Sequence, residues 1–265
     1  MANQGRDLAP IYLPPRGRPL GSNLIWKIGA LFVIPVLRLA TKPVWLGAKN
    51  IPATGPVIVI SNHISYLDPL LFAHFLYRSG RAVRFLGKAS LFRVPLLGWV
   101  LRQTGQVPVE REVEGGAVMA LSHAAAALRA GHCVGVYPEG TLTRDPSHWP
   151  MVAKTGLARL AVATRVPVIP CAQWGATNIL SPYTRRPKLW PRAKVTVIAG
   201  KPLDFSRWYG KEADHVAMLE ATAYAMAAVT TLLSEIRGES PPAEIFDRHG
   251  SDLPRMGNYK KRKNK

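Results

Sequence analysis

The sequence predicts an α/β fold with a largely parallel central sheet flanked by helices. Short apolar runs rich in β-branched residues, such as 57–60 and 133–137, alternate along the chain with helical patterns such as 116–130. This alternation is typical of a parallel sheet, because parallel strands need long crossover connections that are usually helices. A length of 265 residues suits a single α/β domain.

The individual elements follow from hydrophobic period, length and interruption by Gly or Pro. We expect strands at residues 57–60, 83–86, 106–109, 133–137, 166–172 and 194–199. We expect helices at residues 24–40, 66–77, 90–101, 116–130, 154–164 and 215–236. The last helix is predicted to dock on the core through one side, formed by Val216, Leu219, Ala223, Met226 and Leu233.

The chain divides into four predicted parts: an irregular lead-in (1–23), a membrane-interface helical segment (24–44), an α/β domain (45–237) and a polar basic tail (238–265). The apolar stretch 24–40 is near the lower length limit for a membrane span. Lys27, Pro35 and Arg38 interrupt it and favour a kinked helix lying in the interface, with Trp26 and Trp45 at headgroup depth. A core helix and a true span are the alternatives.

The charge balance is strongly basic, with 35 Lys and Arg against 16 Asp and Glu, a net charge of +19. Such an excess implies an anionic partner: a phospholipid surface, a nucleic acid or a phosphorylated substrate. Basic clusters interleaved with aromatic residues are not evident, so nucleic acid is the less favoured partner. The basic end, 259–265, is either a solvated tail or an electrostatic membrane anchor.

The two cysteines, Cys133 and Cys171, lie in or beside apolar runs typical of strands. Buried, reduced thiols are the simplest interpretation, and they suit a cytosolic environment. No disulfide framework or zinc site is indicated by their number or spacing.

The first candidate site is the loop 62–68, which leaves a buried strand. His63 is followed five residues later by Asp68, at the start of the next predicted helix. A turn between them can bring the carboxylate to one imidazole nitrogen and leave the other nitrogen to accept a proton. The plainer alternative is a helix cap by Ser65 or Asp68, with His63 merely exposed. Ser65 as a nucleophile and a metal bound by His63 and Asp68 are minor alternatives.

The second candidate site is the loop 137–145, which also leaves a predicted buried strand. It contains Glu139, Gly140, Thr141 and Arg144, so a carboxylate, free backbone amides and a guanidinium lie close together. Such a loop can hold a hydroxylated, phosphorylated headgroup, although an ordinary turn has the same composition. Between the two loops, Lys88 and Arg111 are candidate phosphate contacts, or solvated surface charges.

Four blocks in this order resemble the 1-acyl-sn-glycerol-3-phosphate acyltransferases and their glycerolipid acyltransferase relatives. Asn62-His63 to Asp68 is similar to the His-x4-Asp catalytic block, and 138–141 to the Glu-Gly-Thr block. The final apolar block resembles 166–170. The block that the family uses for glycerol phosphate is matched by Lys88, Leu91, Pro95, Gly98, Gly105 and Arg111.

The resemblance implies transfer of a fatty acyl group from a thioester, acyl-CoA or acyl-ACP, to a lysophosphatidic-acid-like acceptor. His63 would be the general base, oriented by Asp68, without a cofactor, a bound metal or a covalent enzyme intermediate. Glu139, Gly140 and Thr141 would hold the acceptor, with Lys88, Arg111 and Arg144 on its phosphate. The apolar N-terminal segment resembles the family's membrane-embedding helices, so we expect a peripheral or monotopic enzyme on anionic phospholipid at the cytoplasmic face of the cell membrane.

One position departs from the family pattern. An Arg usually follows Glu-Gly-Thr, and here that residue is Leu142, with Arg144 two residues further on. The departure leaves open whether Arg144 replaces the missing Arg, and whether the acceptor is another lysophospholipid or a glycolipid. A hydrolase using the same His and Asp, a catalytically silent membrane scaffold and a nucleic-acid-binding protein are the alternatives in other functional classes.

Overall fold

The computed structural model describes residues 19–110, 113–182, 184 and 186–247. Within them, one sheet has the strand order β1-β7-β6-β2-β5-β3-β4. Its strands are β1 (Thr41–Leu46), β2 (Val57–Ile60), β3 (Val83–Lys88), β4 (Val107–Val109), β5 (Cys133–Val136), β6 (Val168–Trp174) and β7 (Ala193–Ala199). Every neighbouring pair is parallel except β6 and β7. The predicted α/β fold with a largely parallel sheet is confirmed.

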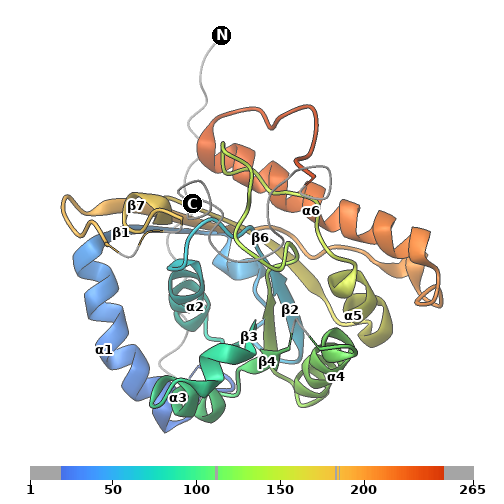
Figure 1. The fold of residues 1–265 in the computed structure, drawn as a ribbon, viewed down its shortest axis with the longest axis horizontal. Helices are drawn as coiled ribbons and strands as arrows, with labels where there is room; N and C mark the ends of the chain where they lie inside the picture. Colours follow the sequence, from blue (N-terminus) through green and yellow to red (C-terminus); the bar gives the residue numbers. More distant parts are fainter. Residues whose placement is uncertain (1–18, 111–112, 183, 185, 248–265) are drawn as a thin grey trace, which may run out of the picture.

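Helices cover both faces of this sheet (Figure 1). They are α1 (Leu24–Ala40), α2 (Asp68–Arg78), α3 (Leu97–Gln103), α4 (Gly116–Arg129), α5 (Gly156–Thr164) and α6 (His215–Arg237). Four short 3-10 turns join them: η1 (Ala48–Asn50), η2 (Ala89–Arg93), η3 (Ala176–Asn178) and η4 (Ser206–Trp208).

Strand β2 shows how the core is divided between the two faces. All four of its residues are buried, and successive side chains point to opposite faces of the sheet. Ile58 and Ile60 pack in a cluster with α4, α5 and α6, whereas Val57 and Val59 pack with Phe72 and other residues of α2. A strand buried on both faces explains the continuous apolar run in the sequence.

Strand β1 was not predicted from the sequence. It contains Pro43, which is tolerated because β1 is an edge strand that pairs only with β7. The predicted helical segment 24–44 therefore ends at Ala40, and 41–44 belongs to the sheet. Trp45 was expected at headgroup depth, but it is buried against His74 and Phe75 in the core.

Helix α1 has the predicted bounds but little burial. Asn23 caps it by accepting a hydrogen bond from the backbone N–H of Trp26 at 3.0 Å. Only Leu37 and Ala40 are buried among its residues. Its exposed large apolar side chains are Leu24, Ile28, Leu31, Phe32, Val33, Val36 and Leu39. A core helix would bury an apolar stripe, and α1 does not.

The docking side of helix α6 was predicted only in part. Met226 and Leu233 are buried, as predicted, whereas Val216, Leu219 and Ala223 are exposed. The buried side is formed by Ala217, Met218, Ala221, Thr222, Ala225, Met226, Val229 and Leu233. Small alanines let the helix approach the sheet closely. The size of the apolar side chains therefore did not predict which side of α6 is buried. Among the described residues, α6 is the one helix long and apolar enough to cross a membrane, but 44% of that stretch is buried, as in a core helix.

Candidate active site

Both predicted loops lie at the same edge of the sheet. Strands β2, β3, β5 and β6 run parallel to one another, so the segments that follow them gather at their carboxyl ends. The loop 61–67 follows β2, the loop 137–145 follows β5, and Lys88 is the last residue of β3. Sites in open α/β sheets are usually found at this edge.

The structure brings His63 and Asp68 into direct contact. The Nδ1 atom of His63 lies 2.9 Å from Oδ2 of Asp68. The same carboxylate oxygen accepts the backbone N–H groups of Ile64 at 2.6 Å and Ser65 at 2.7 Å. Asp68 is buried at the start of α2, followed by Pro69, where a negative charge is favoured by the helix dipole. Asp68 therefore closes the turn and also orients the imidazole.

His63 uses only one of its two imidazole nitrogens in this contact. Its Nδ1 is committed to Asp68, and the side chain is 15% exposed, so the ring can be reached from solvent. Its backbone is held on both sides, because its N–H donates to Glu139 Oε1 at 3.1 Å and its carbonyl accepts the N–H of Thr143 at 2.8 Å. A fixed imidazole with one nitrogen free is the geometry that a general base requires.

Tyr137 was not identified from the sequence as part of the site. Its ring stacks on the His63 imidazole with centroids 4.2 Å apart and an interplanar angle of 22°. Burial, with a smaller contribution from the Asp68 charge, raises the pKa of Tyr137 well above its usual value. The phenol is therefore neutral and acts as a flat support for the imidazole. An aromatic residue just before the Pro-Glu-Gly turn was the available signal.

Asn62 joins the loop 61–67 to the neighbouring strand β6. Its side chain accepts the N–H of Gln173 at 2.9 Å and donates to the Gln173 carbonyl at 3.0 Å. Gln173 Nε2 in turn donates to the Asn62 carbonyl at 3.1 Å and to the Tyr137 hydroxyl at 3.3 Å. These bonds continue the pairing of β2 with β6 beyond Ile60 and fix where His63 leaves the sheet.

Glu139 is not placed as the sequence suggested. It is fully buried, and its two oxygens accept the N–H of His63 and, at 3.0 Å, the N–H of Met151. Burial raises the pKa of Glu139 to about 8 despite these hydrogen bonds. A carboxyl group with no solvent access does not contact an acceptor headgroup. It joins the two loops to each other.

The remainder of the second loop is also turned inward. Gly140 adopts a φ of +70°, a left-handed conformation that glycine reaches without steric cost. Thr141 is half-buried, whereas Leu142 and Arg144 are buried, with Arg144 only 2% exposed. In this conformation solvent does not reach the Arg144 guanidinium, so a phosphate in solution could not contact it.

Two exposed lysines are candidate phosphate contacts at this edge among the described residues. Lys88, proposed from the sequence, is exposed at the end of β3, and Arg111 lies outside the described residues. Lys154 was not singled out in the sequence. It is exposed, its backbone N–H donates to the Pro138 carbonyl at 3.0 Å, and its Cε would lie 3.4 Å from a Cβ placed on Gly140. The sequence signal that could have identified it is a lysine just before the start of helix α5.

Other nucleophiles lie in positions unsuited to covalent catalysis. The Ser65 hydroxyl is buried and donates to the Leu180 carbonyl at 2.7 Å. Cys133 and Cys171 are free and buried, as predicted. Burial raises the pKa of Cys133 to about 12, so its thiol is protonated at neutral pH. Among the described residues, no group of three or more His, Cys, Asp and Glu side chains could hold a metal ion.

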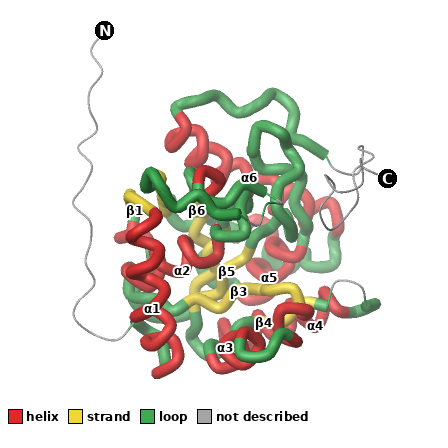
Figure 2. Tube along the Cα trace, turned by 60° about the vertical axis from the view of Figure 1, so that its left-hand side comes forward, coloured by secondary structure: helices red, strands yellow, loops and turns green. Residues whose placement is uncertain are grey.

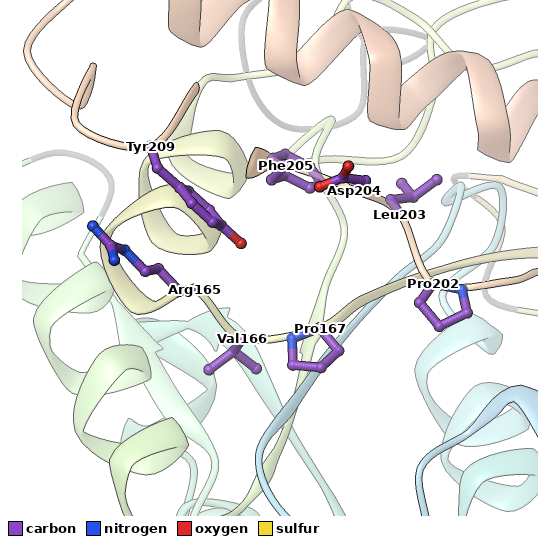
Figure 3. Close-up of a pocket in the computed structure, with 8 residues that line it drawn as sticks. All are labelled: Arg165, Val166, Pro167, Pro202, Leu203, Asp204, Phe205 and Tyr209. Atoms are coloured by element: carbon purple, nitrogen blue, oxygen red, sulfur yellow. The ribbon is translucent and has the colours of Figure 1, made fainter. Parts of the chain in front are cut away.

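The hollow drawn in Figure 3 lies away from this site. Its volume is about 330 Å³, and it is lined by Arg165, Val166, Pro167, Pro202, Leu203, Asp204, Phe205 and Tyr209. Val166 and Pro167 precede β6, so the hollow lies at the amino end of that strand, opposite the edge that carries His63. The hollow is therefore not part of the candidate active site.

Comparisons with known proteins point to one family of enzymes. The model of the Acyltransferase family matches residues 45–174. The chain is 31% identical over 169 residues to the chloroplastic 1-acyl-sn-glycerol-3-phosphate acyltransferase BAT2 of Brassica napus, covering 63% of this chain and 45% of that protein. It is 33% identical over 132 residues to a 1-acyl-sn-glycerol-3-phosphate acyltransferase of Borreliella burgdorferi, covering 50% of this chain and 51% of that protein.

These matches span about half the length of the curated relatives. A solved structure, the 1-acyl-sn-glycerophosphate (LPA) acyltransferase PlsC of Thermotoga maritima, superposes with a TM-score of 0.60 at 23% identity, covering 82% of this chain and 84% of that one. This likeness supports the fold. Residues 45–174 therefore match the Acyltransferase family, and the relatives that this chain resembles are 1-acyl-sn-glycerol-3-phosphate acyltransferases.

Proposed function

We propose that this protein transfers a fatty acyl group from a thioester to the free hydroxyl of a 1-acyl-glycerol-3-phosphate-type lysolipid, in phospholipid biosynthesis. The observation that carries the proposal is the contact of 2.9 Å between His63 Nδ1 and Asp68 Oδ2. It occurs in an acyltransferase domain whose relatives act, by their names, on 1-acyl-sn-glycerol-3-phosphate.

In the proposed reaction, His63 Nε2 takes the proton of the acceptor hydroxyl. The hydroxyl oxygen attacks the thioester carbonyl carbon and forms a tetrahedral intermediate. The carbon–sulfur bond then breaks, and the imidazolium returns its proton to the leaving thiolate, so that the products are an ester and a free thiol. Asp68 holds the tautomer and stabilises the imidazolium. A general base of this kind contributes about 10²–10⁴-fold to the rate.

The acceptor phosphate needs a cation at the same edge of the sheet. Lys88 is exposed at the end of β3, and Lys154 lies against Gly140, so both can reach a headgroup beside His63. Arg111, as expected from the sequence, is a third candidate. Because Leu142 stands where the family has an Arg, a different lysophospholipid or glycolipid acceptor is the second candidate function.

The donor is acyl-CoA or an acyl carrier protein thioester, with no cofactor. The enzyme would work at the cytoplasmic face of the membrane, bound to anionic phospholipid through α1 and through its positive charge. Two features support this placement: α1 leaves its large apolar side chains exposed, and the net charge is +19. Helix α1 has 17 residues and is therefore about 25 Å long, which is shorter than the roughly 30 Å thickness of a bilayer core.

The test is an assay of the purified full chain with a panel of lysolipids and both kinds of thioester, with products identified by mass spectrometry. We expect a diacyl product from the lysophosphatidic acid acceptor and release of free thiol in equal amount. Release of free fatty acid without an acylated lipid would identify a thioester hydrolase and overturn the proposal. Acylation of a different lysolipid alone would establish the second candidate.

A further inference from the structure

We propose that the turn formed by η2 and the start of α3, residues 89–99, is a second lipid-contact element beside α1. The two elements would rest on one anionic phospholipid surface. This inference rests on the proposed function, because it concerns how the enzyme reaches a lipid acceptor. The partner that this surface binds is a lipid bilayer rather than a protein.

The turn presents large apolar side chains to solvent. Leu91, Val94, Leu96, Leu97 and Trp99 are all exposed, and Leu96 is 74% exposed. Isolated exposed apolar residues are common, but five within nine residues form a patch. Trp99 adds an aromatic side chain of the kind enriched at membrane–water interfaces.

The backbone of the turn adopts an energetically unfavourable conformation in which this patch is exposed. Leu96 has a φ of +56°, an unfavourable conformation for a residue with a side chain. The turn is packed tightly around it: a Cβ on Gly98 would lie 2.1 Å from the Phe92 carbonyl oxygen, and Arg102 Nη1 donates to that carbonyl at 2.7 Å. A strained turn that exposes leucine is not explained by core packing.

The turn and α1 lie on the same side of the molecule. Trp26 Nε1 donates to the Thr104 carbonyl at 3.1 Å, and Asn23 Nδ2 donates to the Gln103 carbonyl at 2.6 Å, so the start of α1 is fastened to the end of α3. Figures 1 and 2 both show α1 and α3 as neighbours. The two elements, each of which exposes apolar side chains, therefore lie beside each other on one flank of the protein.

The charge of this flank fits an anionic lipid surface. From residue 19 to residue 110 the chain contains ten Lys and Arg, of which Arg81 and Arg84 are buried, and two acidic residues, the buried Asp68 and Glu110. Lys27 and Arg38 lie on α1, and Arg93 lies in the turn, where it pairs with Glu110 at 3.1 Å. Basic residues near an anionic membrane strengthen binding to it. A protein partner with an apolar face would not need this separation of charge.

The turn also stands next to the candidate active site. It follows directly after Lys88, at the edge of the sheet that carries His63. Contact of the turn with lipid would place the mouth of the site at the depth of the headgroups. An acyl acceptor could then reach His63 without leaving the interface.

The experiment compares two double variants of the full chain. Leu96→Gly with Trp99→Ser removes apolar groups from the turn, and the Gly relaxes the positive φ. The matched control, Val118→Ser with Met119→Ser, removes exposed apolar groups from α4, which packs on the opposite face of the sheet from α2. Flotation with vesicles of equal phosphatidylcholine and phosphatidylglycerol measures binding, and thermal unfolding monitors the fold.

We expect the turn variant to bind at least about tenfold more weakly than the parent, and the control to bind like the parent. Parent-like binding by the turn variant, or an equal loss in the control, would overturn the inference. If the double variant has a lower melting temperature than the parent, the single variant Leu96→Gly replaces it in the test. This change relieves backbone strain, so we expect weaker vesicle binding with no loss of thermal stability, and parent-like binding would overturn the inference.

The same proteins, assayed on acceptor dispersed in detergent, separate this inference from the proposed function. An active parent together with a turn variant that binds vesicles normally contradicts the inference alone. A parent without acyl transfer, together with the expected loss of vesicle binding, contradicts the proposed function and leaves the lipid contact standing.

Discussion

The loops after β2 and β5 carry similar residues but use them in opposite ways. In the first loop, Asp68 is buried so that His63 can remain partly exposed and fixed in one orientation. In the second, Glu139 and Arg144 are themselves buried. The first loop has the geometry to act on a substrate, and the second is the frame that holds the first in place. Charged residues at the end of a parallel strand are therefore a guide to the site, but not to which of them meets the substrate.

The largest expected effect tests the first loop. His63→Ala should reduce turnover by about 10²–10⁴-fold, because the acceptor hydroxyl loses its base. Its far-ultraviolet circular dichroism and vesicle binding should match the parent, since the Glu139 and Thr143 bonds to residue 63 use its backbone. Turnover within a few-fold of the parent would mean that the imidazole is not the base.

A smaller loss is expected from Asp68→Asn. The change keeps an oxygen for the turn amides but removes the charge that supports the imidazolium, so we expect roughly a 10²-fold loss of turnover, at the low end of the range for a base. The pH dependence of kcat distinguishes the two roles of Asp68. A purely structural role would lower the melting temperature and leave that profile unchanged.

The cations at the edge provide a third comparison. Lys88→Ala should raise the KM for a phosphorylated acceptor about tenfold, the size expected for loss of one charge-assisted contact, with the thioester KM unchanged. Lys154→Ala measured in the same way shows whether the second lysine shares this role.

Arg144→Ala is the matched contrast among the cations, because Arg144 is buried. It should lower thermal stability and leave the acceptor KM nearly unchanged. A selective rise in acceptor KM for the folded Arg144 variant would show that the second loop opens to bind phosphate.

The smallest effect concerns stability and pH. The pKa of Glu139 is raised from 4.5 to about 8, so the folded protein holds a proton that the unfolded chain has released in this range. Stability contributed by the protonated carboxyl should therefore fall as pH rises from about 4.5 to 8. Glu139→Gln lacks this titration, so the difference in melting temperature between parent and variant should shrink as pH rises. A constant difference would show that Glu139 does not titrate there.

Much of the fold follows from the sequence because its signals are local. The bounds of α1 and β2 match the prediction, and α4 ends just before Gly131, which has a positive φ. Strand β1 escaped prediction because its tolerance of Pro43 depends on being at the sheet edge, which is a tertiary fact. The docking side of α6 was predicted only in part for a similar reason: Met226 and Leu233 are buried, but the alanines at 217, 221 and 225 are buried where Val216 and Leu219 were expected.

The candidate site was predicted in part. The spacing of His63 and Asp68 predicted their contact, because a turn of five residues limits how far apart the two side chains can lie. The burial of Glu139 and Arg144 could not be seen, since it depends on how the segment 145–154 folds back over the loop, with Met151 donating to Glu139. Tyr137 was missed because its stacking on His63 joins two strands that are distant in the sequence but adjacent in the sheet.

The most direct test of the difference between the two loops is one turnover assay on two folded variants, His63→Ala and Glu139→Gln, with the same acceptor and thioester at saturating concentration. If the first loop acts on the substrate and the second only frames it, His63→Ala loses at least about 10²-fold and Glu139→Gln stays within about tenfold of the parent. Equal losses in both variants, with the fold and melting temperature of each preserved, would contradict this account.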